Sequence, residues 1–149
     1  MVPNIETLNI LLVEDDTADQ KLIRSMIEKQ EKAYDLCVAS SAEEAVEILR
    51  PSENSNGGFT RPDLIVLDLN MPGMGGREFL KHIKADERLK QIPVVILTCS
   101  ISEMDILDSY RLQAAGFVTK PAGLIELERV ITGIIKYWSV LCRLPCRGY

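Results

Sequence analysis

Five short apolar runs recur along the chain, and each is bounded by polar or charged residues. Their lengths and their near-continuous apolar character are typical of strands that are buried on both faces of a parallel sheet. The run at 34–39 is the weakest of the five, and the run at 92–97 is the most hydrophobic although it includes Pro93 near its start. The five predicted strands are 8–13, 34–39, 64–67, 92–97 and 116–119.

Between these runs, apolar residues return every three or four positions, as they do along one face of a helix. The first such segment carries Leu22, Ile23, Met26 and Ile27 on one stripe. Ser40 or Ser41 can cap the second helix, since a glutamate stands three residues after each of them. Further helices are predicted around 79–83 and 106–110 and from about 122 to 141. Five strands alternating with five helices predict an α/β domain with a doubly wound, five-stranded parallel sheet.

The segment 51–62 interrupts this alternation with a polar stretch between two prolines. We interpret it as a surface loop, because the half-chain before it is too small to fold alone. The 149 residues suit one domain, so we expect a single domain over 1–149. Beyond Lys120, only a C-terminal helix and tail at 122–149 remain, and we expect no output domain.

Composition narrows the possible partners. Apolar residues make up 46% of the chain, charged residues 26%, and the net charge is −5, which argues against nucleic acid or a membrane surface as the main partner. The chain has no apparent signal peptide and no long uncharged apolar run, so we expect a cytoplasmic protein. The four cysteines have no disulfide-framework spacing, and the pair Cys142 and Cys146 lacks a nearby histidine for a metal knuckle.

Chemically active side chains follow four of the five predicted strands: Glu14 and Asp15, Asp68, Thr98 and Lys120. The carboxyl ends of parallel strands share one edge of the sheet, where ligands bind. Clustered carboxylates repel one another, and a hard cation such as Mg²⁺ would relieve that repulsion. Asp68 could then act as the nucleophile that forms an aspartyl phosphate, with Thr98 and Lys120 holding the phosphoryl oxygens. Each residue alone has an ordinary explanation as a turn, cap or surface residue, but their order at successive strand ends favours one site.

Four segments carry a family resemblance. They read Leu-Leu-Val-Glu-Asp-Asp at 11–16, Asp-Leu-Asn-Met-Pro-Gly-Met-Gly-Gly at 68–76, Val-Ile-Leu-Thr-Cys-Ser at 95–100 and Gly-Phe-Val-Thr-Lys-Pro at 116–121. Over essentially its whole length the sequence resembles the CheY-like receiver domain of two-component response regulators, which have a flavodoxin-like fold.

The resemblance implies a role for each site residue. Asp68 would be the phosphoacceptor and Glu14 and Asp15 the acidic pair, with Asp15 as a direct Mg²⁺ ligand. The remaining roles would be a metal contact through the backbone carbonyl of Asn70, a switch hydroxyl at Thr98, a switch aromatic at Phe117, a phosphate-binding lysine at Lys120 and a cis peptide bond before Pro121.

The function that the resemblance implies is signalling. A sensor histidine kinase would donate a phosphoryl group to Asp68, and the face formed by the fourth helix, fifth strand and fifth helix would change. Such a protein is no enzyme beyond the Mg²⁺-dependent phosphorylation and dephosphorylation of its own aspartate. The main alternative is a receiver that is never phosphorylated and serves only as an interaction module.

Two enzyme or cofactor classes fit the sequence less well. A haloacid-dehalogenase-type phosphatase needs a second Asp where Asn70 stands. A flavodoxin-like flavin protein needs phosphate-binding residues after the first strand, where this chain has acids.

Within the family, the loop at 51–62, the segment 76–95 and the ending Tyr137-Trp138…Leu144-Pro145 look most like the small regulators that partner bacterial phytochrome kinases. Apolar residues at Ile125, Tyr137 and Val140 also widen the apolar stripe of the last helix beyond one face. We expect a homodimer through this helix and the tail. The alternative is that the tail folds back over the excess apolar surface.

Overall fold

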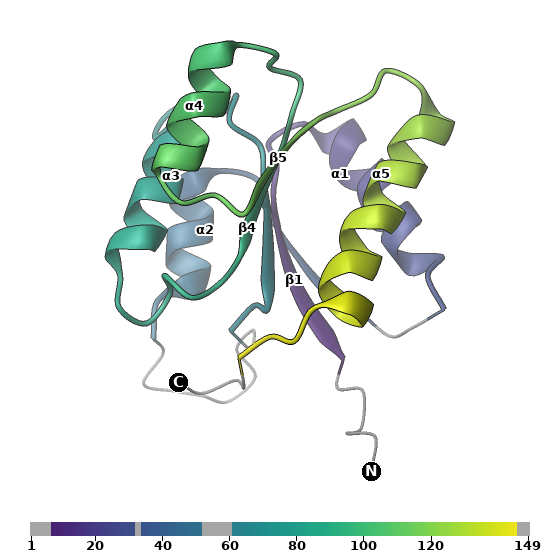
Figure 1. Ribbon diagram of the computed structural model, residues 1–149, viewed down its shortest axis with the longest axis horizontal. Helices are drawn as coiled ribbons and strands as arrows, with labels where there is room; N and C mark the ends of the chain where they lie inside the picture. The colour runs from purple at the N-terminus through teal and green to yellow at the C-terminus, as the bar shows by residue number, and fades with distance from the viewer. Residues whose placement is uncertain (1–6, 32–33, 52–60, 146–149) are drawn as a thin grey trace.

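The structure, a computed structural model, describes residues 7–31, 34–51 and 61–145. Strands and helices alternate along these residues, as the apolar pattern predicts (Figure 1). The strands are β1 (Leu8–Val13), β2 (Tyr34–Ala39), β3 (Leu64–Leu67), β4 (Val94–Thr98) and β5 (Gly116–Thr119). The helices are α1 (Thr17–Glu28), α2 (Ala42–Leu49), α3 (Gly75–Ala85), α4 (Glu103–Arg111) and α5 (Leu124–Lys136), which continues as a π-helical turn, η1 (Tyr137–Leu141).

All five strands are parallel and form one sheet in the order β2-β1-β3-β4-β5. The three central strands are buried along their whole length, which explains why their sequences are continuously apolar instead of alternating. The predicted doubly wound α/β fold is therefore confirmed.

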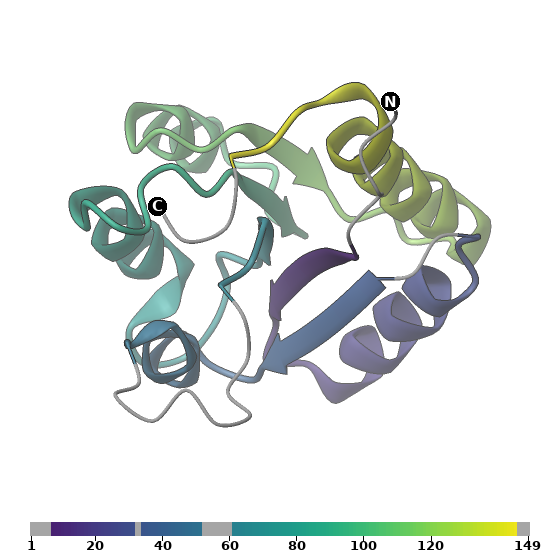
Figure 2. The same cartoon turned by 90° about the horizontal axis from the view of Figure 1, so that it is seen from below.

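Helices cover both faces of the sheet. In Figure 2, α1 and α5 lie on one side of it and α2, α3 and α4 lie on the other. Each face has its own core: one is centred on Phe79, Leu80 and Ile83 of α3, and the other joins Ile23 of α1 to Ile131 of α5. Successive residues of β1 alternate between them, with Leu11 in the first core and Ile10 in the second.

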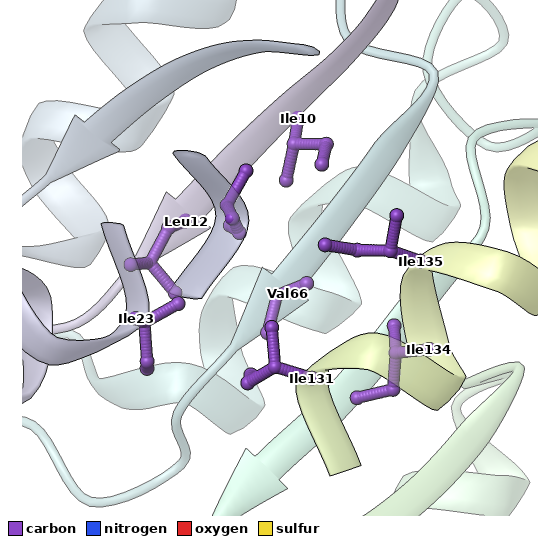
Figure 3. A pocket seen from close by; sticks show the side chains of 8 residues that line it. Ile10, Leu12, Ile23, Val66, Ile131, Ile134 and Ile135 are labelled. Carbon is purple, nitrogen blue, oxygen red and sulfur yellow. The ribbon is translucent and has the colours of Figure 1, made fainter. Parts of the chain in front are cut away.

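The second core contains a small void of about 10 Å³ between β1, α1 and α5 (Figure 3). Aliphatic side chains alone line it, and an apolar cavity of this kind stays dry. It is a packing defect and offers no group for chemistry. The lining residues are Ile10, Leu12, Ile23, Ile27, Val66, Ile131, Ile134 and Ile135.

Helix ends follow local chemistry. Ser41, and not Ser40, is the N-cap of α2: its hydroxyl accepts from the Glu44 N–H at 3.0 Å, and the Glu44 carboxylate accepts from the Ser40 N–H at 2.8 Å. Helix α5 begins at Leu124, two residues later than predicted, with Gly123 as its cap. Strand β4 likewise begins after Pro93, which has no N–H to donate to the ladder.

The chain after α5 turns back beneath the sheet, at the ends where the strands begin (Figure 2). Leu144 packs against the core shared by α1 and α5, and with Pro145 it lies beside Pro62 and Pro93 in a shallow pocket. The tail therefore folds back in part, yet Tyr137, Val140 and Leu141 stay exposed. Most of the predicted loop at 51–62 and the last four residues lie outside the described residues.

One sequence expectation is wrong. No peptide bond among the described residues is cis, so the bond between Lys120 and Pro121 is trans. The trans form is favoured even before proline, and the Lys120 N–H already continues the β5 ladder by donating to the Thr98 carbonyl at 2.7 Å.

None of the helices in the described part of the chain combines the length and the apolar character that crossing a membrane requires.

Candidate phosphoacceptor and metal site

The sheet itself places the site residues, because three of them are the first residues after a strand and their N–H groups continue the ladder. The Glu14 N–H donates to the Ala39 carbonyl at 3.0 Å, and the Asp68 N–H donates to the Val13 carbonyl at 3.0 Å. Together with the equivalent bond of Lys120, these contacts fix three backbones at one edge of the sheet. The structure therefore confirms that these strand ends converge on one edge of the sheet.

Lys120 lies at the centre of this edge and contacts three carboxylates. Its Nζ is 2.8 Å from Glu14 Oε1, 3.0 Å from Asp68 Oδ2 and 2.9 Å from Asp19 Oδ2. An ammonium group has three donors, so each of them has a partner. The third of these carboxylates, Asp19, lies in the first turn of α1.

Burial makes the charges of this cluster consequential. Glu14 is 1% and Asp68 7% exposed. Burial raises the pKa of Glu14 to about 9, and the neighbouring Asp68 adds to the rise. For Asp68, burial alone would raise the pKa, but the neighbouring Glu14 carboxyl, the Asn70 N–H and the Lys120 ammonium lower it below its ordinary value. Burial likewise disfavours the Lys120 ammonium, yet its three carboxylate partners raise its pKa overall. The cluster therefore favours the charged forms of Asp68 and Lys120 and disfavours the charged form of Glu14.

Three of the predicted metal ligands gather closely. Glu14, Asp15 and Asp68 each offer a carboxylate oxygen within 4.8 Å of the others. Glu14 Oε2 is buried and has no hydrogen-bond partner among the described residues, which is the condition of an atom that awaits a ligand. An all-oxygen donor set of this kind fits a hard divalent cation.

Thr98 lies beside Asp68 and is fully buried. Its hydroxyl accepts from Asn70 Nδ2 at 3.3 Å and from the Ser100 N–H at 3.4 Å. The Asn70 N–H in turn donates to Asp68 Oδ1 at 3.1 Å. Asn70 thus links Asp68 to Thr98.

Phe117 occupies the middle of the edge strand β5 and is half-buried, packed against the core on the α3 side. Its N–H points away from β4 and donates to the hydroxyl of Tyr110 on α4 at 3.2 Å. Tyr110 thereby satisfies an edge group of the sheet and ties α4 to the strand that carries Phe117.

The loop between β3 and α3 is held by Glu43 of α2. The Glu43 carboxylate accepts from the Met74 N–H at 2.7 Å, at the start of a helix whose N-cap makes no side-chain bond of its own. Glycine is required twice nearby. Gly73 has a φ of +78°, and a Cβ on Gly76 would lie 2.6 Å from the Cα of Leu69.

Sequence reasoning missed Asp19, Glu43 and Tyr110. Asp19 and Glu43 act on groups that are remote in the chain, 101 and 31 residues away, and Tyr110 acts on a backbone N–H of the following strand. Asp19 lies four residues after Asp15, in the first turn of the helix that follows the acidic pair, and that spacing is the only signal in the sequence that could have suggested it.

The fold and the strand-end site define the class of protein. The family model of the response regulator receiver domain matches residues 10–132, and the chain belongs to this family.

Similar proteins span nearly the same length. The chain is 38% identical to the response regulator Rcp1 of Synechocystis sp. over 91% of this chain and 92% of that protein. It is 36% identical to the probable methanogenesis regulatory protein FilR2 of Methanothrix harundinacea, over 91% of this chain and 86% of that protein.

The structure is also similar to solved receivers. The phosphorylated cyanobacterial phytochrome response regulator RcpA superposes with a TM-score of 0.87 at 40% identity, covering 94% of this chain and 99% of that one. The Mn²⁺-bound form of Rcp1 superposes with a TM-score of 0.85 at 37% identity, covering 93% and 99%.

Proposed function

We propose that this protein is a single-domain response regulator that is switched by phosphorylation of Asp68. The observation that carries the proposal is the position of Asp68: its buried carboxylate directly follows β3, and the Lys120 ammonium lies 3.0 Å away. A carboxylate oxygen of Asp68 would attack the phosphorus of a phosphohistidine on a sensor histidine kinase. The P–N bond breaks, its electron pair leaves with the imidazole, and an acyl phosphate forms.

Residues of the chain would position and neutralise the transferred group. The Lys120 ammonium would turn one of its donors from Asp68 to a phosphoryl oxygen. The Thr98 hydroxyl, which accepts a hydrogen bond from Asn70 at the same edge of the sheet, would hold another phosphoryl oxygen. Phosphoryl transfer depends mostly on such positioning and charge neutralisation.

Mg²⁺ would be held by Glu14, Asp15, Asp68 and the backbone carbonyl of Asn70. The orphaned Glu14 Oε2 and the all-oxygen donor set support this assignment, as does the solved Mn²⁺-bound form of the similar Rcp1. When bound, the cation would supply charge neutralisation of the carboxylates and of the incoming phosphoryl group.

The proposed output is a change at Thr98 and Phe117. Thr98 would move toward the phosphoryl group, and Phe117, now half-buried, would turn further into the core. The hydrogen bond between the Phe117 N–H and Tyr110 would carry the change to α4. Ile101, Met104 and Leu107 are exposed apolar residues in and just before this helix, and they offer a surface that a target could contact.

The test is phosphorylation by a small acyl phosphate donor, read by intact-mass spectrometry. We expect one phosphoryl group per wild-type chain in Mg²⁺ and none in EDTA or in Asp68→Asn. Asp35→Asn, which removes an exposed carboxylate from β2, should behave like the wild type. If the wild type takes up no phosphoryl group, the chain is an unphosphorylated interaction module instead.

The similarity to RcpA and Rcp1 supports a bacterial phytochrome as the sensor histidine kinase, since RcpA is a cyanobacterial phytochrome response regulator. Phosphotransfer from each histidine kinase of the same genome would test this partner. Fastest transfer from a kinase without a phytochrome module would contradict it. The cytoplasmic setting that the sequence indicates stays a prediction.

We further propose a homodimer through α5 and the segment after it. Ile125 is 67% and Leu141 75% exposed, and Leu124, Tyr137 and Val140 extend this apolar surface. Sedimentation of the wild type should show dimers that Leu141→Asp and Val140→Asp weaken, whereas Glu28→Gln on α1 should not. A wild-type monomer at high concentration, with or without phosphorylation, would exclude the dimer.

A further inference from the structure

Asp19 differs from the other two carboxylates that contact Lys120. Glu14 and Asp68 belong to the cluster that can hold a cation, and Asp19 does not. Binding of a cation and phosphorylation of Asp68 would both draw on the oxygens of Glu14 and Asp68. Neither event needs the Asp19 carboxylate, so the 2.9 Å contact between Asp19 and Lys120 can persist through both.

Asp19 is also rigidly placed. Its N–H donates to the Asp16 side chain at 2.9 Å, which fixes the first turn of α1, and that helix is anchored in the core by Ile23, Met26 and Ile27. A carboxylate at a helix N-terminus is stabilised by the helix dipole. A group on such an element can hold a catalytic side chain within narrow limits.

The two partners differ in exposure. The Lys120 side chain is 8% exposed and that of Asp19 is 32% exposed. Asp19 therefore approaches the ammonium from the solvent side, while Glu14 and Asp68 approach it from the sheet edge. Without Asp19, the flexible Lys120 side chain would have no partner on the solvent side once the cation and the phosphoryl group engaged Glu14 and Asp68.

We propose, on the basis of the proposed phosphorylation of Asp68, that Asp19 is a positioning residue for Lys120. The carboxylate of Asp19 keeps one ammonium donor engaged, and it thereby holds Nζ over Asp68 while the other donors are released to the phosphoryl group. Asp19 itself touches no reacting atom.

The effect of Asp19 on net charge and its effect on the position of Lys120 predict opposite changes in anion binding when the carboxylate is removed. Deleting a negative charge beside the site should strengthen the binding of an anion there, whereas losing the anchor of Lys120 should weaken it. The sign of the effect therefore separates a positioning role from a simple contribution to net charge.

The experiment uses the full chain with Mg²⁺ and beryllofluoride, an analogue of the phosphoryl group. With ¹⁵N-lysine labelling, the Lys120 ammonium signal, assigned by its loss in Lys120→Arg, should be visible in the wild type with and without beryllofluoride. In Asp19→Ala the signal should disappear in the loaded state, and the Kd for beryllofluoride should rise by about tenfold, as for the loss of one charge-assisted hydrogen bond.

Asp19→Asn keeps an acceptor oxygen and should retain most of the affinity and the signal. Glu28→Ala removes an equal charge from an exposed position on the same helix and should change neither. Unchanged or tighter beryllofluoride binding by Asp19→Ala would overturn the role of Asp19. If instead the wild type itself failed to bind beryllofluoride in Mg²⁺, the proposed phosphorylation of Asp68 would fall.

Discussion

Asp15 is the residue of the acidic cluster whose charge the protein itself compensates least. Glu14 and Asp68 share the Lys120 ammonium, but Asp15 has no contact with that group although its carboxylate lies within the same 4.8 Å cluster. The Asp15 carboxylate therefore adds to the cluster a negative charge that Lys120 does not contact, and a bound cation would neutralise it. A group of this kind serves binding at the expense of stability.

We predict that Asp15→Asn stabilises the protein in EDTA by about 1 kcal/mol, because it removes like-charge repulsion near a partly buried cluster. Mg²⁺ should raise the melting temperature of the wild type and have little effect on this variant. Thermal denaturation with and without Mg²⁺ measures both effects, and Asp35→Asn serves as the control. A variant that is less stable than the wild type in EDTA would show that the repulsion is negligible.

Among the helices, α3 depends on a neighbour for its start. Its first turn has no side-chain cap of its own, and the Met74 N–H is satisfied by Glu43 of α2. This bond also ties down the loop that carries Asn70. Accepting the Met74 N–H lowers the pKa of the Glu43 carboxyl below its ordinary value.

A lowered folded-state pKa gives a pH dependence of definite sign. The stabilisation from ionised Glu43 is complete above its unfolded pKa, about 4.3, and is lost as the pH falls through the lower folded value. We expect the melting temperature of the wild type to exceed that of Glu43→Gln near pH 7, and the difference to vanish as the pH falls below the folded-state pKa of Glu43. Glu47→Gln on the same helix should show no such trend, and a difference that persists in acid would contradict the prediction.

At the scale of elements, the sequence was informative where burial dominates. The continuous apolar runs of β1, β3 and β4 predicted buried strands, and the residues at their ends, Glu14, Asp68 and Thr98, marked the site. Contacts between side chains and the backbone of other elements were not predictable, because nothing in the local sequence around Glu43 or Tyr110 encodes its partner. The cis bond expected before Pro121 came from resemblance alone, and the trans bond of the structure shows the limit of that inference.

The whole molecule rests on two cores that the sheet keeps apart. The core between α1, α5 and the sheet is imperfectly filled, since eight aliphatic side chains surround a void (Figure 3). Ile131 contacts it from α5 and is 3% exposed. Shortening a side chain there enlarges an existing gap instead of creating a new one.

We predict that Ile131→Ala lowers the free energy of unfolding by about 2–4 kcal/mol, through lost burial and a larger cavity. Ile125→Ala, on the exposed face of the same helix, should stay within about 0.5 kcal/mol of the wild type. Urea denaturation at low protein concentration measures both. Equal losses in the free energy of unfolding for the two variants would mean that α5 is not packed as described.

Helix α4 contrasts with the other four helices, because none of its apolar side chains is buried and only Ser109 is. It is attached by polar contacts: Arg77 bridges to Asp105 at 2.8 Å and to Asp108 at 3.2 Å, Ser100 bonds Asp105, and Tyr110 bonds the Phe117 N–H. Water and dissolved ions can replace every one of these attachments, whereas they cannot replace the packing that holds α1 or α3. Ionic strength should therefore loosen α4 while it leaves the rest of the fold intact. The helix next to the switch residues is the one whose displacement costs the molecule least.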